Sequence, residues 1–164
     1  MPLTIELKTP KDALAKARRE HQELAEAISC QDKTRIGDAL YNFAVSVYHV
    51  KDWLIETPSA VYTKKDVEDY LKATPALTAF RDLCNSSKHH TIHRYTPEAT
   101  DVTSSSMASY SLSMPKFLPF LFRRKLAFRV KIIMTDGRRL EAISLGKQAL
   151  DAWDNFFNKQ GVLK

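Results

Sequence analysis

Glycine, cysteine and long apolar runs are all scarce in this chain of 164 residues. It has 4 glycines and no G-x-G-x-x-G or P-loop pattern, which disfavours nucleotide binding through a glycine-rich loop. The G-x-S-x-G motif of many serine hydrolases is absent as well. The 2 cysteines lack the C-x-x-C spacing of metal and redox sites, so both are expected to be reduced thiols.

No apolar run approaches the roughly 20 residues that a membrane-spanning helix needs. The first residues, "MPLTIELKTPKDAL", have neither the basic start nor the apolar centre of a signal peptide. We therefore expect no membrane partner and a cytoplasmic location. The composition, 44% hydrophobic and 27% charged, is ordinary for a globular protein, and the length suits a single domain.

Helical spacing and capping signals dominate the first half of the chain. Thr9 is the predicted N-cap of a first helix, on whose apolar stripe His21 is interpreted as a packing residue. Apolar residues recur at helical spacing over 33–56, which predicts a long second helix. Capping signals at both Thr63 and Thr74 predict that the third helix is broken.

The apolar period changes from 3.6 to 2 after the third helix. Residues 108–114 and 126–134 alternate as strands do, and the Asp-Gly pair of "TDGR" predicts a two-residue hairpin turn before the return strand "RLEAIS". Ser144 is the predicted cap of a final helix that ends at Gly161.

These elements predict an α+β fold. It should be a mainly helical bundle of four to five helices, with a small three-stranded antiparallel sheet between the third and last helices. The single domain, 1–164, then consists of a helical part over 10–93, a strand-rich insertion over 100–143 and a closing helix over 145–160.

The third helix ends in the polar decapeptide "RDLCNSSKHH". Arg81, Asn85 and His89 fall on one flank of this helix, beside its apolar seam. An arginine can hold a phosphate through two parallel hydrogen bonds, a histidine can move the proton of a ribose 2′-hydroxyl, and an amide can orient either group. We predict these three as catalytic residues that need no metal or other cofactor. The alternative is a helix end whose cations, Lys88 among them, only favour the helix dipole.

His49 and Asp52 lie on a mixed stripe of the second helix. They are predicted binding residues, and together with His89 they could supply imidazole and carboxylate ligands to a metal. A hydrogen-bonded pair buried in the bundle is the commoner outcome for such a histidine and aspartate. We expect Asp52 to lie in a partly buried site near Lys88 or His89.

The net charge of +6 is concentrated in one segment. Residues 81–144 hold 11 Lys and Arg against 5 Asp and Glu, whereas residues 1–80 hold 11 against 12. The densest part includes Arg123, Arg124 and Lys125, which are predicted to attract phosphates without sequence specificity. A solvated strand that uses cations to block edge pairing is the alternative.

The pattern of helices with "FRDLCNSSKHH" at the end of the third resembles the bacterial HEPN superfamily of compact helical bundles. Arg81 and Asp82 match the arginine and polar residue of the family motif, and His89 matches its histidine, although seven residues separate Arg81 from His89. The resemblance implies a metal-independent endoribonuclease that works as a homodimer. The strands over 100–143 depart from the plain bundle, and "YHVKDW", "NSSKH" and "DGRRLEA" give a general likeness to uncharacterised bacterial proteins.

The sequence thus predicts two alternative functions. The first is a HEPN-like protein that binds or cleaves RNA. The second is a non-enzymatic interaction or regulatory module that contacts a protein partner through its sheet edge and the "KFLPFLF" segment.

Overall fold

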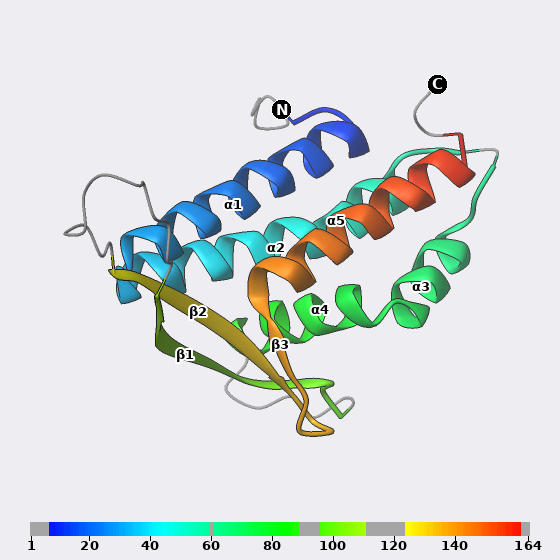
Figure 1. Ribbon diagram of the computed structural model, residues 1–164. Helices are drawn as coiled ribbons and strands as arrows, with labels where there is room; N and C mark the ends of the chain where they lie inside the picture. The colour runs from blue at the N-terminus through cyan, green and yellow to red at the C-terminus, as the bar shows by residue number, and fades with distance from the viewer. Residues whose placement is uncertain (1–6, 60, 89–95, 111–123, 162–164) are drawn as a thin grey trace.

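Five helices and one antiparallel sheet make up the described part of the chain. The computed structural model describes residues 7–59, 61–88, 96–110 and 124–161. The three strands lie between the fourth and fifth helices along the chain, so the predicted α+β fold is confirmed (Figure 1). The elements are α1 (Pro10–Cys30), α2 (Lys33–Glu56), α3 (Lys64–Ala73), α4 (Pro75–Lys88), β1 (Ala99–Tyr110), β2 (Arg124–Met134), β3 (Arg139–Glu141) and α5 (Ala142–Lys159).

Capping boxes fix the starts of α1 and α3. The hydroxyl of Thr9 accepts the amide of Asp12 at 3.2 Å, while the Asp12 carboxylate accepts the amide of Thr9 at 2.9 Å. Thr63 and Asp66 repeat the arrangement at α3. Hydrogen bonds from the hydroxyl and then the amide of Thr63 lower the pKa of Asp66. Both predicted N-caps are confirmed.

The predicted break in the third helix separates α3 from α4. A residue before proline is driven out of the helical region, and Thr74, which precedes Pro75, is extended with φ −111° and ψ 102°. Its carbonyl then accepts the amides of Leu77 and Thr78 at 3.0 and 3.1 Å, which starts the first turn of α4.

The core lies where α1, α2, α4 and α5 meet, while α3 lies at the end of the bundle away from the sheet (Figure 1). Phe43 of α2 meets Phe80 of α4 edge to face, with ring centroids 4.8 Å apart. Trp153 of α5 is fully buried and donates its indole N–H to the carbonyl of Val47 at 2.9 Å. The long α2 is thereby fixed between its neighbours.

His21 is a packing residue, as predicted. Its ring lies against Phe43, with centroids 5.1 Å apart, and its Nε2 is 2.9 Å from the carbonyl oxygen of Ile143. The ring also covers Gly146 of α5, where a Cβ atom would lie 2.6 Å from its Cδ2. This close approach of α1 and α5 depends on the missing side chain.

The sheet has the strand order β1-β2-β3 and packs one face on the helices. Val130, Ile132 and Met134 of β2 are buried there, and the odd-numbered residues between them face outward. The register shifts between Ala99 and Asp101, which leaves Thr100 as a bulge. The first strand therefore starts at Ala99, nine residues earlier than the alternation of apolar residues predicts, because serines and threonines occupy half of it.

The turn between β2 and β3 has three residues, so the predicted two-residue turn is wrong. The amide of Met134 donates to the carbonyl of Arg138 at 2.8 Å, which leaves Thr135, Asp136 and Gly137 as the loop. Gly137 has φ +83°, the left-handed conformation that such a loop requires at its last position.

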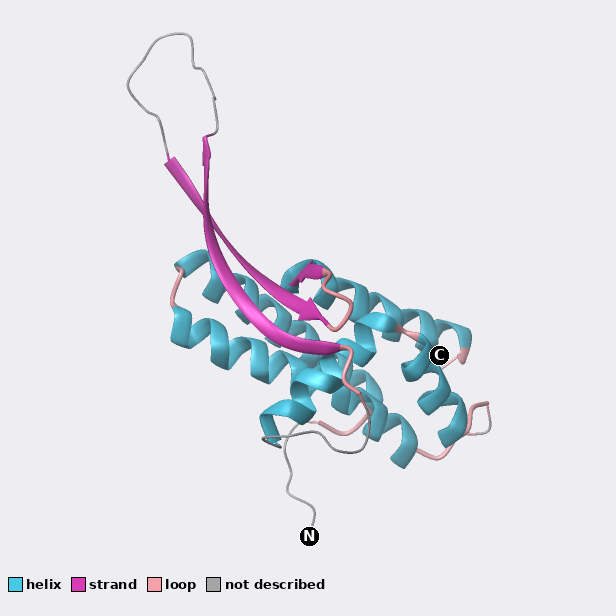
Figure 2. Cartoon of the chain, turned by 90° about the horizontal axis from the view of Figure 1, so that it is seen from below, coloured by secondary structure: helices cyan, strands magenta, loops and turns pink. Residues whose placement is uncertain are grey.

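The hairpin of β1 and β2 is longer than the body it packs on. Figure 2 shows the far ends of both strands extending away from the helices. β3 pairs only with Ile133, Ile132 and Lys131, so the rest of the hairpin is a two-stranded ribbon.

The last helix starts directly after β3, so the predicted Ser144 cap is wrong. Glu141 occupies the N-cap position, and the hydroxyl of Ser144 donates to its carboxylate. The helix end near Gly161 is as predicted, with φ +66° at that glycine. The inner stripe of α5 consists of four buried residues, Leu145, Ala149, Trp153 and Phe156.

Both cysteines are thiols, with Cys30 exposed and Cys84 buried. None of the described helices combines the length and apolarity that a membrane span requires.

Gly146→Ala should destabilise the fold. The new Cβ would lie 2.6 Å from His21 Cδ2 and 2.8 Å from Phe43 Cε1, and both rings belong to the packed interior. We expect a loss of about 1–3 kcal/mol in the free energy of unfolding, measured with urea. Gly37→Ala is the matched control, because no atom beyond its chain neighbours and its own helical backbone lies within 4 Å of the new Cβ. It should stabilise α2 by about 0.5–1 kcal/mol, and equal effects of the two changes would contradict the tight contact.

Candidate functional site

The polar flank of α4 holds two of the three predicted catalytic residues. Arg81 and Asn85 lie one turn apart, and both side chains are half-buried. His89 lies outside the described residues, and only the backbone of Lys88 is described. The convergence of Arg81, Asn85 and His89 therefore stays a prediction.

The guanidinium of Arg81 is engaged by the residue that follows it. Its Nε and Nη2 atoms lie 2.9 and 2.8 Å from Oδ1 of Asp82. The Asp82 side chain is 0% exposed and that of Arg81 17%. Burial of an unpaired carboxylate costs several kcal/mol, so the cation is needed where it lies. Arg81 thus has a structural function that the sequence does not reveal.

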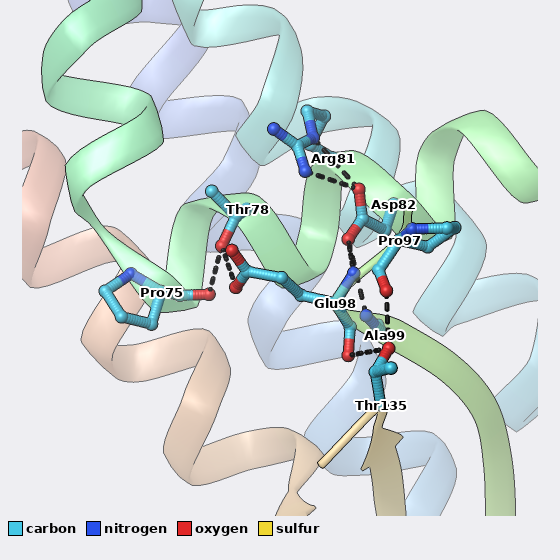
Figure 3. A network of polar contacts seen from close by, with 8 residues as sticks. All are labelled: Pro75, Thr78, Arg81, Asp82, Pro97, Glu98, Ala99 and Thr135. Atoms are coloured by element: carbon cyan, nitrogen blue, oxygen red, sulfur yellow. Dashed lines mark hydrogen bonds and ion pairs between the residues drawn. The ribbon is translucent and has the colours of Figure 1, made fainter. Parts of the chain in front are cut away.

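The other oxygen of Asp82 holds the start of β1. Oδ2 accepts the amide of Glu98 at 2.6 Å and that of Ala99 at 3.3 Å (Figure 3). These amides begin an edge strand, so they have no partner strand on that side. One buried carboxylate therefore joins α4 to the sheet.

Further polar contacts tie the β2–β3 turn to the same place. The amide of Thr135 donates to the carbonyl of Glu98 at 2.7 Å, and its hydroxyl contacts the carbonyl of Pro97. The Glu98 carboxylate accepts the hydroxyl of Thr78 of α4 at 2.7 Å (Figure 3). We call this set the Asp82 network; it consists of Thr78, Arg81, Asp82, Glu98, Ala99 and Thr135.

Sequence reasoning misses most of this network. It identifies Asp82 only as the polar residue that follows Arg81, and it does not point to Thr78 or Glu98. The available signal is the spacing of Thr78 and Asp82, four residues apart beside the apolar residues of the same helix. Such a pair inside an apolar seam predicts buried hydrogen bonds, but not their partners.

The predicted pair on α2 is partly exposed. The Asp52 side chain is 50% exposed, and its predicted contact with Lys88 or His89 lies outside the described side chains, so that contact stays a prediction. Asp52 forms an ion pair with Lys51 at 2.9 Å, while the half-buried His49 has its ring 6.1 Å from that of Tyr48. Burial lowers the pKa of Lys51, but the hydrogen bond to Asp52 and the nearby Tyr48 raise it more.

The metal alternative finds no support in the described residues. Within 7–59, 61–88, 96–110 and 124–161, no three His, Cys, Asp or Glu side chains are grouped as a metal ion would require. Its proposed third ligand, His89, is not among them.

The basic segment forms part of the outer face of the sheet. Arg129 and Lys131 alternate with buried residues of β2 and lie opposite Ser105 and Thr103. Of the predicted binding residues in this segment, Arg123 lies outside the described part. Only register positions are described for the other two, with Arg124 opposite Tyr110 and Lys125 opposite Ser109.

A pocket of about 440 Å³ lies beside the β2–β3 turn. Its walls come from the start of α4, the residue before β1 and the turn itself. The carboxylate of Asp136 accepts the amide of Arg138 at 3.0 Å and its Nε at 2.6 Å. These two hydrogen bonds, the backbone one first, lower the pKa of Asp136. The lining residues are Pro75, Glu98, Met134, Thr135, Asp136 and Arg138.

No protein-family model matches the chain, and comparisons with curated proteins and with solved structures give no significant match. The resemblance to the HEPN superfamily therefore stays a prediction.

Asp82→Ala should destabilise the protein far more than Asp52→Ala. The first change leaves a half-buried guanidinium and two strand amides without their acceptor, so we expect a loss of about 3–5 kcal/mol. The second removes an exposed ion pair worth at most about 1 kcal/mol. Urea unfolding of both variants measures the difference, and similar values would contradict the role given to Asp82.

Proposed function

We propose that this protein binds RNA through the outer face of its β1–β2 hairpin. The observation that supports this best is a row of cations on β2 beside a row of hydroxyl groups on β1. Arg129 is paired in register with Ser105, and Lys131 with Thr103. Cations attract the phosphates, and serine and threonine hydroxyls can donate hydrogen bonds to the same oxygens.

The charge of this face is only partly offset within the described structure, where Glu141 lies opposite Lys131 in register and Asp101 lies opposite Ile133. Arg138, in the turn, has Asp136 as its partner at 2.6 Å. Among the residues described, no ion pair is found for Arg129, Lys131 or Arg139. Asp101 and Glu141 also lie on this face, both near its base, so the more distant part of the described face is the more basic one.

The shape of the hairpin suits a nucleic acid. It extends away from the helices, so a strand of RNA can follow its face without meeting the bundle (Figure 2). Single-stranded RNA is commonly bound on the open face of a sheet, where its bases are unstacked. The proposal keeps the cytoplasmic location predicted from the sequence.

RNA cleavage by Arg81, Asn85 and His89 is a separate proposal. In that proposal Arg81 would have to hold a phosphate, although the Nε and Nη2 atoms of Arg81 already contact the buried Asp82. Binding through the sheet does not require Arg81 to serve two partners. For this reason we favour RNA binding as the primary function.

A protein-interaction module is the second candidate, and the edge of β1 favours it. β1 pairs with β2 on one side, and its 12 residues include Asp101 as the one charged residue and no proline. Lysine and proline are common devices that protect such edges from pairing. A strand of a partner, or β1 of a second copy in a homodimer, could add to this edge.

Binding to a short single-stranded RNA should weaken steeply with salt. The plot of log affinity against log salt concentration should become less steep by about 0.7 for each cation that no longer neutralises a phosphate. The double variant Arg129→Ala/Lys131→Ala should therefore reduce the slope by about 1.4, measured by fluorescence anisotropy. Lys72→Ala, an exposed cation on α3 at the other end of the molecule, is the control and should leave the slope unchanged. An RNA affinity that does not change with salt concentration would contradict the proposal and favour a protein partner.

His89→Ala tests the cleavage proposal. The variant should melt like the wild type and lose about 10²–10⁴-fold of any RNA cleavage that persists in a chelator, because a general acid or base has been removed. A wild-type protein that cleaves none of a varied set of RNAs would exclude the nuclease and leave binding untouched.

A further inference from the structure

In the described part of the chain, no strand pairs with the edge of β1 that faces away from β2. The amide of Met134 donates to Arg138 and so points toward β3, and this direction alternates along a strand, so the odd-numbered residues of β2 point toward β1. The carbonyl of Ile133 agrees, because it accepts the hydroxyl of Thr100. Beyond the bulge, odd-numbered residues of β1 lie opposite odd-numbered residues of β2. The even-numbered residues of 102–110 therefore direct their backbone N–H and C=O groups to the open edge.

This edge carries few of the features that prevent pairing with another strand. α4 meets it at its start, where Oδ2 of Asp82 accepts the amides of Glu98 and Ala99. Over 102–110, where the hairpin extends away from the helices, the strand contains no charged residue and no proline (Figure 2). Val102 is 37% exposed, although residues of β2 on the same face are buried. A strand added here would gain backbone hydrogen bonds and cover Val102.

We infer that the occupant of this edge is β1 of a second copy of the chain, paired antiparallel about a two-fold axis at Ser105. The inference rests on the second candidate function, an interaction at this edge, and not on RNA binding. A two-fold axis perpendicular to a sheet makes two identical edge strands antiparallel, so one sequence supplies both sides of the ladder. In this register Ser104 of each copy exchanges hydrogen bonds with Ser106 of the other. The two sheets become one, with both basic faces on the same side.

The charges of the hairpin favour a second copy as the occupant. β1 contains no lysine or arginine, whereas β2 contains several. The Arg129 positions of the two copies are three strand spacings apart, about 14 Å, which exceeds the Debye length of about 8 Å in physiological salt. Asp101 comes opposite Ser109 of the second copy, whose neighbour in register is Lys125. Opposite charges therefore share that row, while like charges are kept apart.

Ser104→Pro tests the pairing. The N–H of residue 104 points to the open edge, so proline removes one hydrogen bond per copy from the dimer and leaves the ladder with β2 intact. Sedimentation velocity over a range of concentrations should show the wild type as a dimer in equilibrium with its monomer. Ser104→Pro should raise the dissociation constant at least about tenfold. Ser104→Ala is the matched control, because it removes the same hydroxyl but keeps the N–H, and it should dimerise like the wild type.

Cysteine cross-linking tests the register without relying on a proline. At the two-fold axis Ser105 faces its own copy in a non-hydrogen-bonded pair, whose Cα atoms are about 4.5 Å apart, a separation that a disulfide can bridge. The background is Cys30→Ser, because Cys30 is exposed. Ser105→Cys should form a disulfide-linked dimer on mild oxidation. Thr103→Cys should not, because the two copies of that residue are four residues apart along the ladder, about 13 Å.

A monomeric wild type would overturn the inference and leave a strand of a different protein as the occupant of the edge. A dimer that keeps its affinity in Ser104→Pro, or that cross-links through Thr103→Cys, would overturn it too, because the interface would lie elsewhere or in another register. The second candidate function itself would fail if the amides of Val102, Ser104 and Ser106 were protected from hydrogen exchange in the monomer, since the edge would then be closed. The salt dependence of RNA binding tests the primary function separately.

Discussion

The buried carboxylate of Asp82 determines where the sheet meets the helical bundle. Two strand amides and one guanidinium converge on it from different parts of the chain. Because its side chain is fully buried, these three donors stand in for water, and removal of any one of them leaves the carboxylate poorly compensated. The direction in which β1 leaves the bundle is set at this point.

The basic outer face of the hairpin and the open edge of β1 both depend on that direction. The bulge at Thr100 follows the anchored residues at once, so the alternation of inward and outward side chains along β1 is fixed from its first residues outward. A shift of one residue would exchange the buried and basic sides of the hairpin. The pocket has the same origin, because its carboxylate belongs to one anchored residue and its far wall to the turn that Thr135 ties to that residue.

The helices could be predicted from the sequence because their signals are local. Thr9 and Thr63 cap residues three positions away, and Pro75 acts on its immediate neighbour. The start of β1 could not be predicted in this way, because its serines and threonines show no apolar alternation. The contacts of Asp82 with residues 98 and 99 span 16 and 17 residues, and nothing in the spacing of the chain indicates such partners. The basic residues of the candidate site could be predicted from the sequence, but the rest of the site depends on such distant contacts and could not.

The last helix also has a consequence for the order in which the protein folds. The contacts within α1–α2, α3–α4 and the hairpins join segments that are close in sequence, whereas α5 reaches back over 82 residues to Tyr70 and over 106 residues to Val47 on α2. During synthesis the chain emerges from its N-terminal side, so the aromatic interior cannot close before α5 is available. Until then Phe43 and Phe80 lack one wall, and the nascent chain presents an apolar groove in which α5 itself is the missing occupant.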